Sequence, residues 1–74
     1  MILLTQTLIQ IVQAGGGVVI DLNKQMYLPQ TLIQVAQAAA NSGATVTIKN
    51  PNFLLPQTMI QIAQAGRGKV IFEI

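Results

Sequence analysis

Asp21 and Glu73 are the only acidic side chains in this 74-residue sequence, and paired carboxylates can perform general acid–base or glycosidase chemistry. The chain has no histidine and no cysteine, which removes imidazole catalysis, thiolate nucleophiles and the most common metal ligands. Both carboxylates lie in segments predicted to be strands, where a cross-strand charge ladder with Lys49 is the simpler interpretation. The sequence therefore predicts no enzyme activity, no metal site and no cofactor.

Glycine clusters at residues 15–17 and 66–68 are a second place to look for chemistry, because glycine-rich loops can bind phosphate. Phosphate loops lead from a strand into the start of a helix. Both clusters here lead from a predicted helix into a predicted strand, so we interpret them as helix caps. Arg67, which stands between two glycines, and Lys69 form a possible anion contact.

Three asparagines follow predicted strands, and ligands of open parallel sheets bind beyond the carboxyl ends of the strands. Asparagine is also a residue that tight turns require, so turn chemistry is the favoured interpretation of Asn23, Asn50 and Asn52. A small-ligand or anion site formed by these loops together with Arg67 and Lys69 is kept as an alternative function.

One segment occurs three times, at residues 4–14, 28–38 and 55–65. Its Gln-Thr pairs begin at Gln6, Gln30 and Gln57, so the spacings are 24 and 27 residues, which is typical of repeat architecture. We predict a single small domain over residues 1–74 with three repeats, at about 4–27, 28–54 and 55–74.

Each repeat predicts a helix followed by a strand. Apolar residues at three- and four-residue steps indicate three helices: one over about 5–14, one from 29 to a stop near 41–43, and one from 56 to the glycines at 66–68. These residues are Leu4, Leu8, Ile11 and Val12, then Leu32, Val35, Ala36 and Ala39, then Met59, Ile62 and Ala63. Short segments rich in β-branched residues predict strands at 18–22, 45–49 and 69–74.

Alternating helices and strands predict an α/β fold with a parallel three-stranded sheet and right-handed crossovers. We expect the strands in sequence order with the helices packed on one face. The alternative is strand order 2-1-3 with helices on both faces. The inner sheet face would carry Val18, Ile20, Leu22, Val46, Ile48, Val70, Phe72 and Ile74. The open face would carry Val19, Asp21, Thr45, Thr47, Lys49, Lys69, Ile71 and Glu73.

A helix-plus-strand unit of this length with a Leu-Pro start resembles a leucine-rich repeat. Val18, Ile20 and Asn23 fit the LxLxxN core of that motif, whereas the second unit has Asn50 one place early and Pro51 at the asparagine position. The resemblance implies a solenoid whose open sheet face binds protein partners. It implies no catalytic residues.

Glutamines form a stripe along each predicted helix, opposite the apolar face. Only 8% of the residues are charged, against about a quarter in an ordinary soluble domain. Glutamine is a good helix former and can simply fill a solvent face, but an uncharged stripe can also bind a partner. We predict a possible interface that includes the edge-strand residues Ile71 and Glu73 and the stripe residues Gln6, Gln10, Gln13, Gln30, Gln34, Gln37, Gln57, Gln61 and Gln64.

These features favour a non-enzymatic, self-associating interaction or structural module, with a second copy or another protein as its partner. A net charge of +2 gives no nucleic-acid signal, and no apolar run is long enough for a membrane span. We expect a cytoplasmic location by default. A fragment or engineered minimal repeat without independent function is the remaining alternative.

Overall fold

A computed structural model describes residues 5–74, apart from the side chain of Phe53. Leu4, predicted to lie on the first apolar helix face, is outside the described residues. The elements are α1 (Thr5–Gln13), β1 (Val18–Asp21), α2 (Pro29–Ser42), β2 (Val46–Lys49), a short 3-10 helix η1 (Pro51–Phe53), α3 (Pro56–Gly66) and β3 (Val70–Glu73). The predicted order of three helix–strand units is confirmed.

The strands form one parallel sheet in the order β1-β2-β3, which confirms the sequential arrangement. Val18, Val46 and Val70 are aligned across the sheet. Strand order 2-1-3 is wrong. The two middle-strand residues Thr47 and Lys49 keep partial exposure on the open face, which a strand covered on both faces does not offer.

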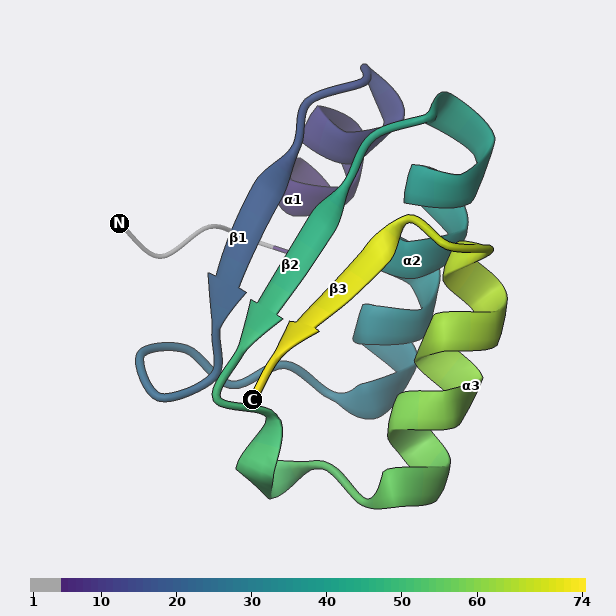
Figure 1. Ribbon diagram of the computed structural model, residues 1–74. Helices are drawn as coiled ribbons and strands as arrows, with labels where there is room; N and C mark the ends of the chain where they lie inside the picture. Colours follow the sequence, from purple (N-terminus) through teal and green to yellow (C-terminus); the bar gives the residue numbers. More distant parts are fainter. Residues whose placement is uncertain (1–4) are drawn as a thin grey trace.

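The two faces of the sheet differ sharply in burial. Ile20, Val46 and Ile48 are buried, whereas Val19 on the opposite face of β1 is 64% exposed and Ile71 in β3 is 51% exposed. Figure 1 shows the helices lying behind the sheet, with the three strands in front. Alternation of side chains along each strand therefore separates a core side from an open side.

The core lies between the sheet and the helices and is centred on the middle repeat. Its fully buried large side chains are Val12, Leu22, Leu32, Val35, Val46, Ile48 and Ile62. Two predictions at the third repeat are wrong. Ala63 is exposed because no helix follows α3 in the described chain, and Ile74 is fully exposed because β3 ends at Glu73.

Proline opens both longer helices, as predicted, because the first helical turn has no internal partner for the missing N–H. Pro29 and Pro56 are the first residues of α2 and α3. At the other end, Gly43 after α2 has a left-handed backbone with φ of 82°. The equivalent residue after α3 is Arg67, which takes the same conformation with φ of 50°. The sequence did not predict Arg67 as the cap residue, because the neighbouring glycines adopt this conformation more easily.

Arg67→Gly is expected to stabilise the fold by about 0.5–1 kcal/mol, because only glycine adopts the left-handed cap conformation without a Cβ penalty. Urea unfolding followed by far-UV circular dichroism measures this change. Lys69→Gly is the control. Lys69 is also exposed but lies outside the cap, so this variant is expected to show no gain. A destabilised Arg67→Gly variant would contradict the expected cap strain.

Candidate functional site

The sheet has two different edges, which are formed by the outer strands β1 and β3. Within residues 5–74, β1 and β3 each pair with β2 on one side only. The inner residues of β3, Val70 and Phe72, are half-buried, whereas their neighbours Val46 and Ile48 in β2 are fully buried. An unpaired strand edge presents backbone N–H and C=O groups that can bind another strand.

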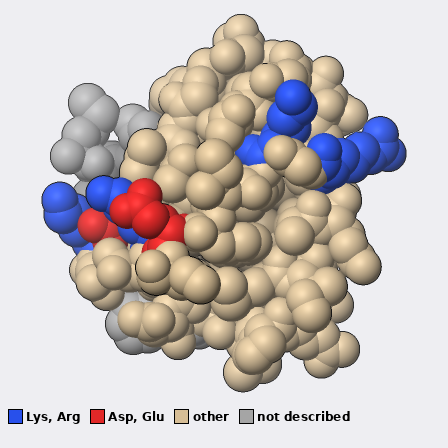
Figure 2. Space-filling model, in the orientation of Figure 1, with Lys and Arg blue, Asp and Glu red and all other residues tan. Residues whose placement is uncertain are grey.

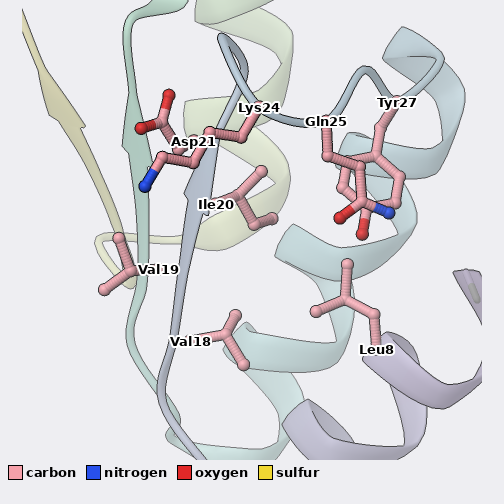
Figure 3. A pocket seen from close by; sticks show the side chains of 8 residues that line it. All are labelled: Leu8, Val18, Val19, Ile20, Asp21, Lys24, Gln25 and Tyr27. Carbon is pink, nitrogen blue, oxygen red and sulfur yellow. The ribbon is translucent and has the colours of Figure 1, made fainter. Parts of the chain in front are cut away.

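A groove of about 300 Å³ runs along the outer edge of β1. In Figure 3, Val18 and Ile20 point toward Leu8 of α1, and Gln25 and Tyr27 reach over the same space from the loop after β1. Val19 points to the other side of the strand. Burial raises the pKa of the Tyr27 phenol, and a hydrogen bond with Gln25 opposes this shift. The groove therefore has an apolar wall beside an unpaired strand edge.

The layer of helices shows the same asymmetry between its two outer members, α1 and α3. Ile9, Ile33 and Ile60 occupy equivalent positions in the repeat; Ile9 and Ile33 pack against the core, whereas Ile60 is 58% exposed. Ile9 lines a hollow with Gln34 and Ala38, so this position faces the next helix. Ile60 is exposed because no helix follows α3 in the described chain.

The helix face that points toward the preceding repeat shows the same difference between inner and outer helices. Val35 and Ile62 are fully buried, whereas the equivalent Ile11 in α1 is 37% exposed. Ile11 was predicted to lie on the apolar helix face, but its side chain is only partly covered. Ala38, on the same face as Val35, is buried against α1, and the equivalent Ala14 is exposed. The contacts between neighbouring repeats within the chain are called the inner joints. Each outer repeat thus exposes apolar positions whose equivalents are buried at the inner joints.

A charged row crosses the open face at the carboxyl ends of the strands, as predicted. Asp21, Lys49 and Glu73 are aligned in register, and Lys49 Nζ lies 3.8 Å from Glu73 Oε1. Asp21 has different partners: its Oδ1 accepts hydrogen bonds from Asn50 Nδ2 at 2.8 Å and from the Asn23 backbone N–H at 2.9 Å. The second strand separates the two carboxylates, so they do not form an acid–base pair.

Hydrogen bonds set the protonation of Asp21. The Asn50 amide and then the Asn23 N–H hold the pKa of this carboxyl below its usual 3.8; Lys24 and Lys49 add to the effect, while burial opposes it. Asn50 reaches Asp21 from a left-handed backbone with φ of 55°, a conformation that asparagine tolerates. The turn interpretation of Asn50 is therefore right, but no local pattern indicated its bond to Asp21.

Asn50→Gly is expected to raise the pKa of Asp21, because glycine keeps the left-handed turn but removes the amide donor. With its lowered pKa, Asp21 stabilises the fold above its unfolded-state pKa and loses that contribution as the pH falls through the folded-state pKa. An NMR titration of the carboxyl carbon checks this. In the control Asn52→Gly, the pKa of Asp21 should stay as in the parent chain, and equal shifts in both variants would contradict the assignment.

The remaining sequence candidates are not brought together. Arg67 and Lys69 precede β3, whereas Asn23 and Asn50 follow β1 and β2, so in a parallel sheet they lie at opposite ends. Figure 2 accordingly shows Lys and Arg side chains in a group separate from the cluster that contains the acidic residues. The predicted ligand site that combined Arg67, Lys69 and the asparagines is not formed.

The glutamine stripe is exposed along its whole length, at Gln6, Gln10, Gln13, Gln30, Gln34, Gln37, Gln57, Gln61 and Gln64. Gln13, Gln34 and Gln37 line one shallow hollow between α1 and α2, so the stripes of neighbouring helices meet. Its use as an interface stays a prediction.

Ser42 is a residue that sequence reasoning missed. Its hydroxyl donates to the Val12 carbonyl at 2.6 Å and accepts from the Ala44 N–H at 3.3 Å, which fastens the end of α2 to the end of α1. A serine next to a helix end looked like ordinary turn composition, and no local signal indicated a bond to a residue thirty positions away.

The fold defines the class of protein: an α/β repeat protein with one parallel sheet. Comparison of the chain with protein-family models, curated proteins and solved structures finds no match. The resemblance to leucine-rich repeats therefore stays a prediction. Over residues 5–74, no helix has the length and hydropathy for a bilayer span, and no three acidic, His or Cys side chains gather as metal ligands.

Proposed function

We propose that this chain is a non-enzymatic, self-associating repeat module. The supporting observation is that equivalent apolar helix positions are buried at the inner joints and exposed at the ends. Ile60 is 58% exposed where Ile33 packs against the core, and Ile11 is 37% exposed where Val35 is fully buried. Exposed apolar groups beside unpaired strand edges are typical of association surfaces.

The low charge of the surface acts in the same direction. Much of the face seen in Figure 2 lacks charged side chains, and the sequence carries four basic and two acidic residues. A surface with many charges of one sign opposes association between copies, and this chain lacks such a surface. Small domains also bury a limited core, so association adds stability that the isolated chain cannot supply.

Sedimentation equilibrium from micromolar to millimolar concentration tests the proposal. We expect the weight-average mass to rise with concentration and the midpoint of thermal unfolding to rise with it, because association stabilises the folded state. A strict monomer over the whole range, with a midpoint independent of concentration, would falsify the proposed self-association.

A further inference from the structure

Backbone hydrogen bonds across the inner strand joints show which groups the outer edges leave unpaired. The Val18 N–H donates to the Thr45 carbonyl at 3.2 Å, and the Val46 N–H donates to the Lys69 carbonyl at 2.8 Å. Backbone groups alternate between the two sides of a strand, so the N–H of Val19 points away from β2, toward the outer edge of β1. The inner joints therefore predict which groups a further parallel strand would use.

If the same pattern is continued, β3 of one copy lies beside β1 of a second copy. The Val70 N–H then faces the Gly17 carbonyl of the second copy, and the Val19 N–H of the second copy faces the Val70 carbonyl. On the open face, Ile71 comes to lie beside Val19, and these side chains are 51% and 64% exposed in the single chain. Two exposed apolar side chains thus cover each other across the joint.

The inner sheet face matches in the same register. Phe72 is aligned with Ile48 and Ile20, so in the joint it lies beside Ile20 of the second copy. Ile20 lines the groove along β1 together with Leu8 and Tyr27. The groove therefore offers an apolar wall to the half-buried Phe72 ring.

Helix α3 of one copy and helix α1 of the second copy complete the joint. Ile60 projects where a following helix would pack, as Ile9 does toward α2. Ile11 and Ala14 of a second copy present the face that Val35 and Ala38 present to α1. The helical repeat thus places exposed apolar groups of the two copies against each other.

The charged row does not match. Along β1, β2 and β3 it alternates as Asp21, Lys49 and Glu73, so the joint places Glu73 beside Asp21 of the second copy. Like charges directly opposite each other on neighbouring strands are destabilising. The charged groups near these carboxylates are Lys49, which pairs with Glu73, and Lys24 in the loop after β1.

We propose that copies of this chain join head to tail, with β3 of one copy beside β1 of the next in parallel register, and that the carboxylates of Glu73 and Asp21 meeting at this joint limit its strength. The inference rests on the self-association proposed above. It adds the polarity of the joint, its register and the charge pair that opposes growth.

Glu73→Lys tests the charge pair by sedimentation velocity. The substitution places a lysine opposite Asp21 of the second copy, so we expect the dissociation constant to fall roughly tenfold and larger species to appear. Within the chain it also places this lysine beside Lys49. The matched control is the double variant Gln30→Lys, Gln34→Lys, which reaches the same net charge of +4, since two charges are added to +2 in each case. Because both glutamines lie on α2, the middle helix, away from the joint, the control should associate as the parent chain does or more weakly.

Val19→Pro tests the strand edge independently. Proline removes one of the two β1 N–H groups that point away from β2, those of Val19 and Asp21, and proline is tolerated at strand edges. We expect a chain with the parent circular dichroism spectrum that sediments as a monomer. This variant keeps the inference testable if Glu73→Lys disturbs folding by breaking the ion pair with Lys49 and placing two lysines opposite each other.

The outcomes separate the two proposals. Tighter association of Glu73→Lys with loss of association in Val19→Pro supports the joint. Association that neither substitution alters overturns the joint but leaves self-association standing, and loss of association only in the glutamine variant then assigns the interface to the stripe. Monomers throughout, Glu73→Lys included, overturn both proposals.

Discussion

Ile48→Ala is expected to lower the free energy of unfolding by about 3 kcal/mol, within the range of about 2–5 kcal/mol measured for such core deletions. Ile48 is 1% exposed at the centre of β2, with Ile20 and Phe72 aligned on either side. Removing three carbon atoms there leaves a cavity that strands on both sides prevent from closing. A domain of this size has a total stability of about 4–11 kcal/mol, so the variant is expected to keep about 1–8 kcal/mol.

Ile71→Ala is the matched control for this prediction. It removes the same atoms from the neighbouring strand, but from a side chain that is 51% exposed on the open face. We expect a loss below about 1 kcal/mol there. Urea unfolding at the same low concentration of both variants, which keeps any contribution from association small, gives both values. Equal losses in the two variants would show that the two faces of the sheet are not distinguished as described.

Gly66→Ala is expected to destabilise the fold by about 1–2 kcal/mol through overpacking. Gly66 is buried at the end of α3, where an added Cβ would clash with the Val70 side chain and contact Ala36 Cβ at 3.6 Å. Alanine is the better helix former by up to about 1 kcal/mol, but this preference is weak at a final helical residue. The close approach of α3 to β3 and α2 therefore makes the net effect of Gly66→Ala destabilising.

A double-mutant cycle with Val70→Ala isolates this clash. Removing the Val70 methyl groups makes room for the added Cβ, so we expect the double variant to be more stable than the sum of the single losses by about 1 kcal/mol. Additive losses would instead mean that Gly66→Ala acts through the backbone and not through Val70. Chemical unfolding with an unchanged m-value is the measurement for all three variants.

Much of this fold was accessible from sequence because the repeat supplies the same information three times. The apolar steps of the helices, the two prolines and the β-branched segments indicated the three α-helices and the three strands, though not η1, and the equivalence of the repeats aligned Asp21, Lys49 and Glu73 correctly. These are local or periodic signals, and period and element type are what a single sequence carries best.

Most of the failures depend on neighbours that differ between repeats. Ala63 follows the buried pattern of Ala36 but is exposed, because α3 has no following helix in the described chain. The bonds from Ser42 to Val12 and from Asn50 to Asp21 join residues about thirty positions apart, and polar composition alone gives no partner. The separation of Arg67 from the asparagines was already implied by the predicted parallel sheet, because Arg67 precedes a strand and the asparagines follow strands.

The layering of strands and helices has a consequence for any assembly built from these units. Neighbouring strands lie about 5 Å apart, while neighbouring helices need about 9 Å, so each unit is a wedge that is wider on its helical side. With layers about 10 Å apart, the wedge angle is roughly 25° per unit and about 75° per three-unit chain. A head-to-tail stack of this chain is therefore curved, with the sheet on the inner side, and about five copies complete a circle. Such a stack closes on itself as a ring if its units stay in one plane, and winds into a coil if each joint adds a small twist.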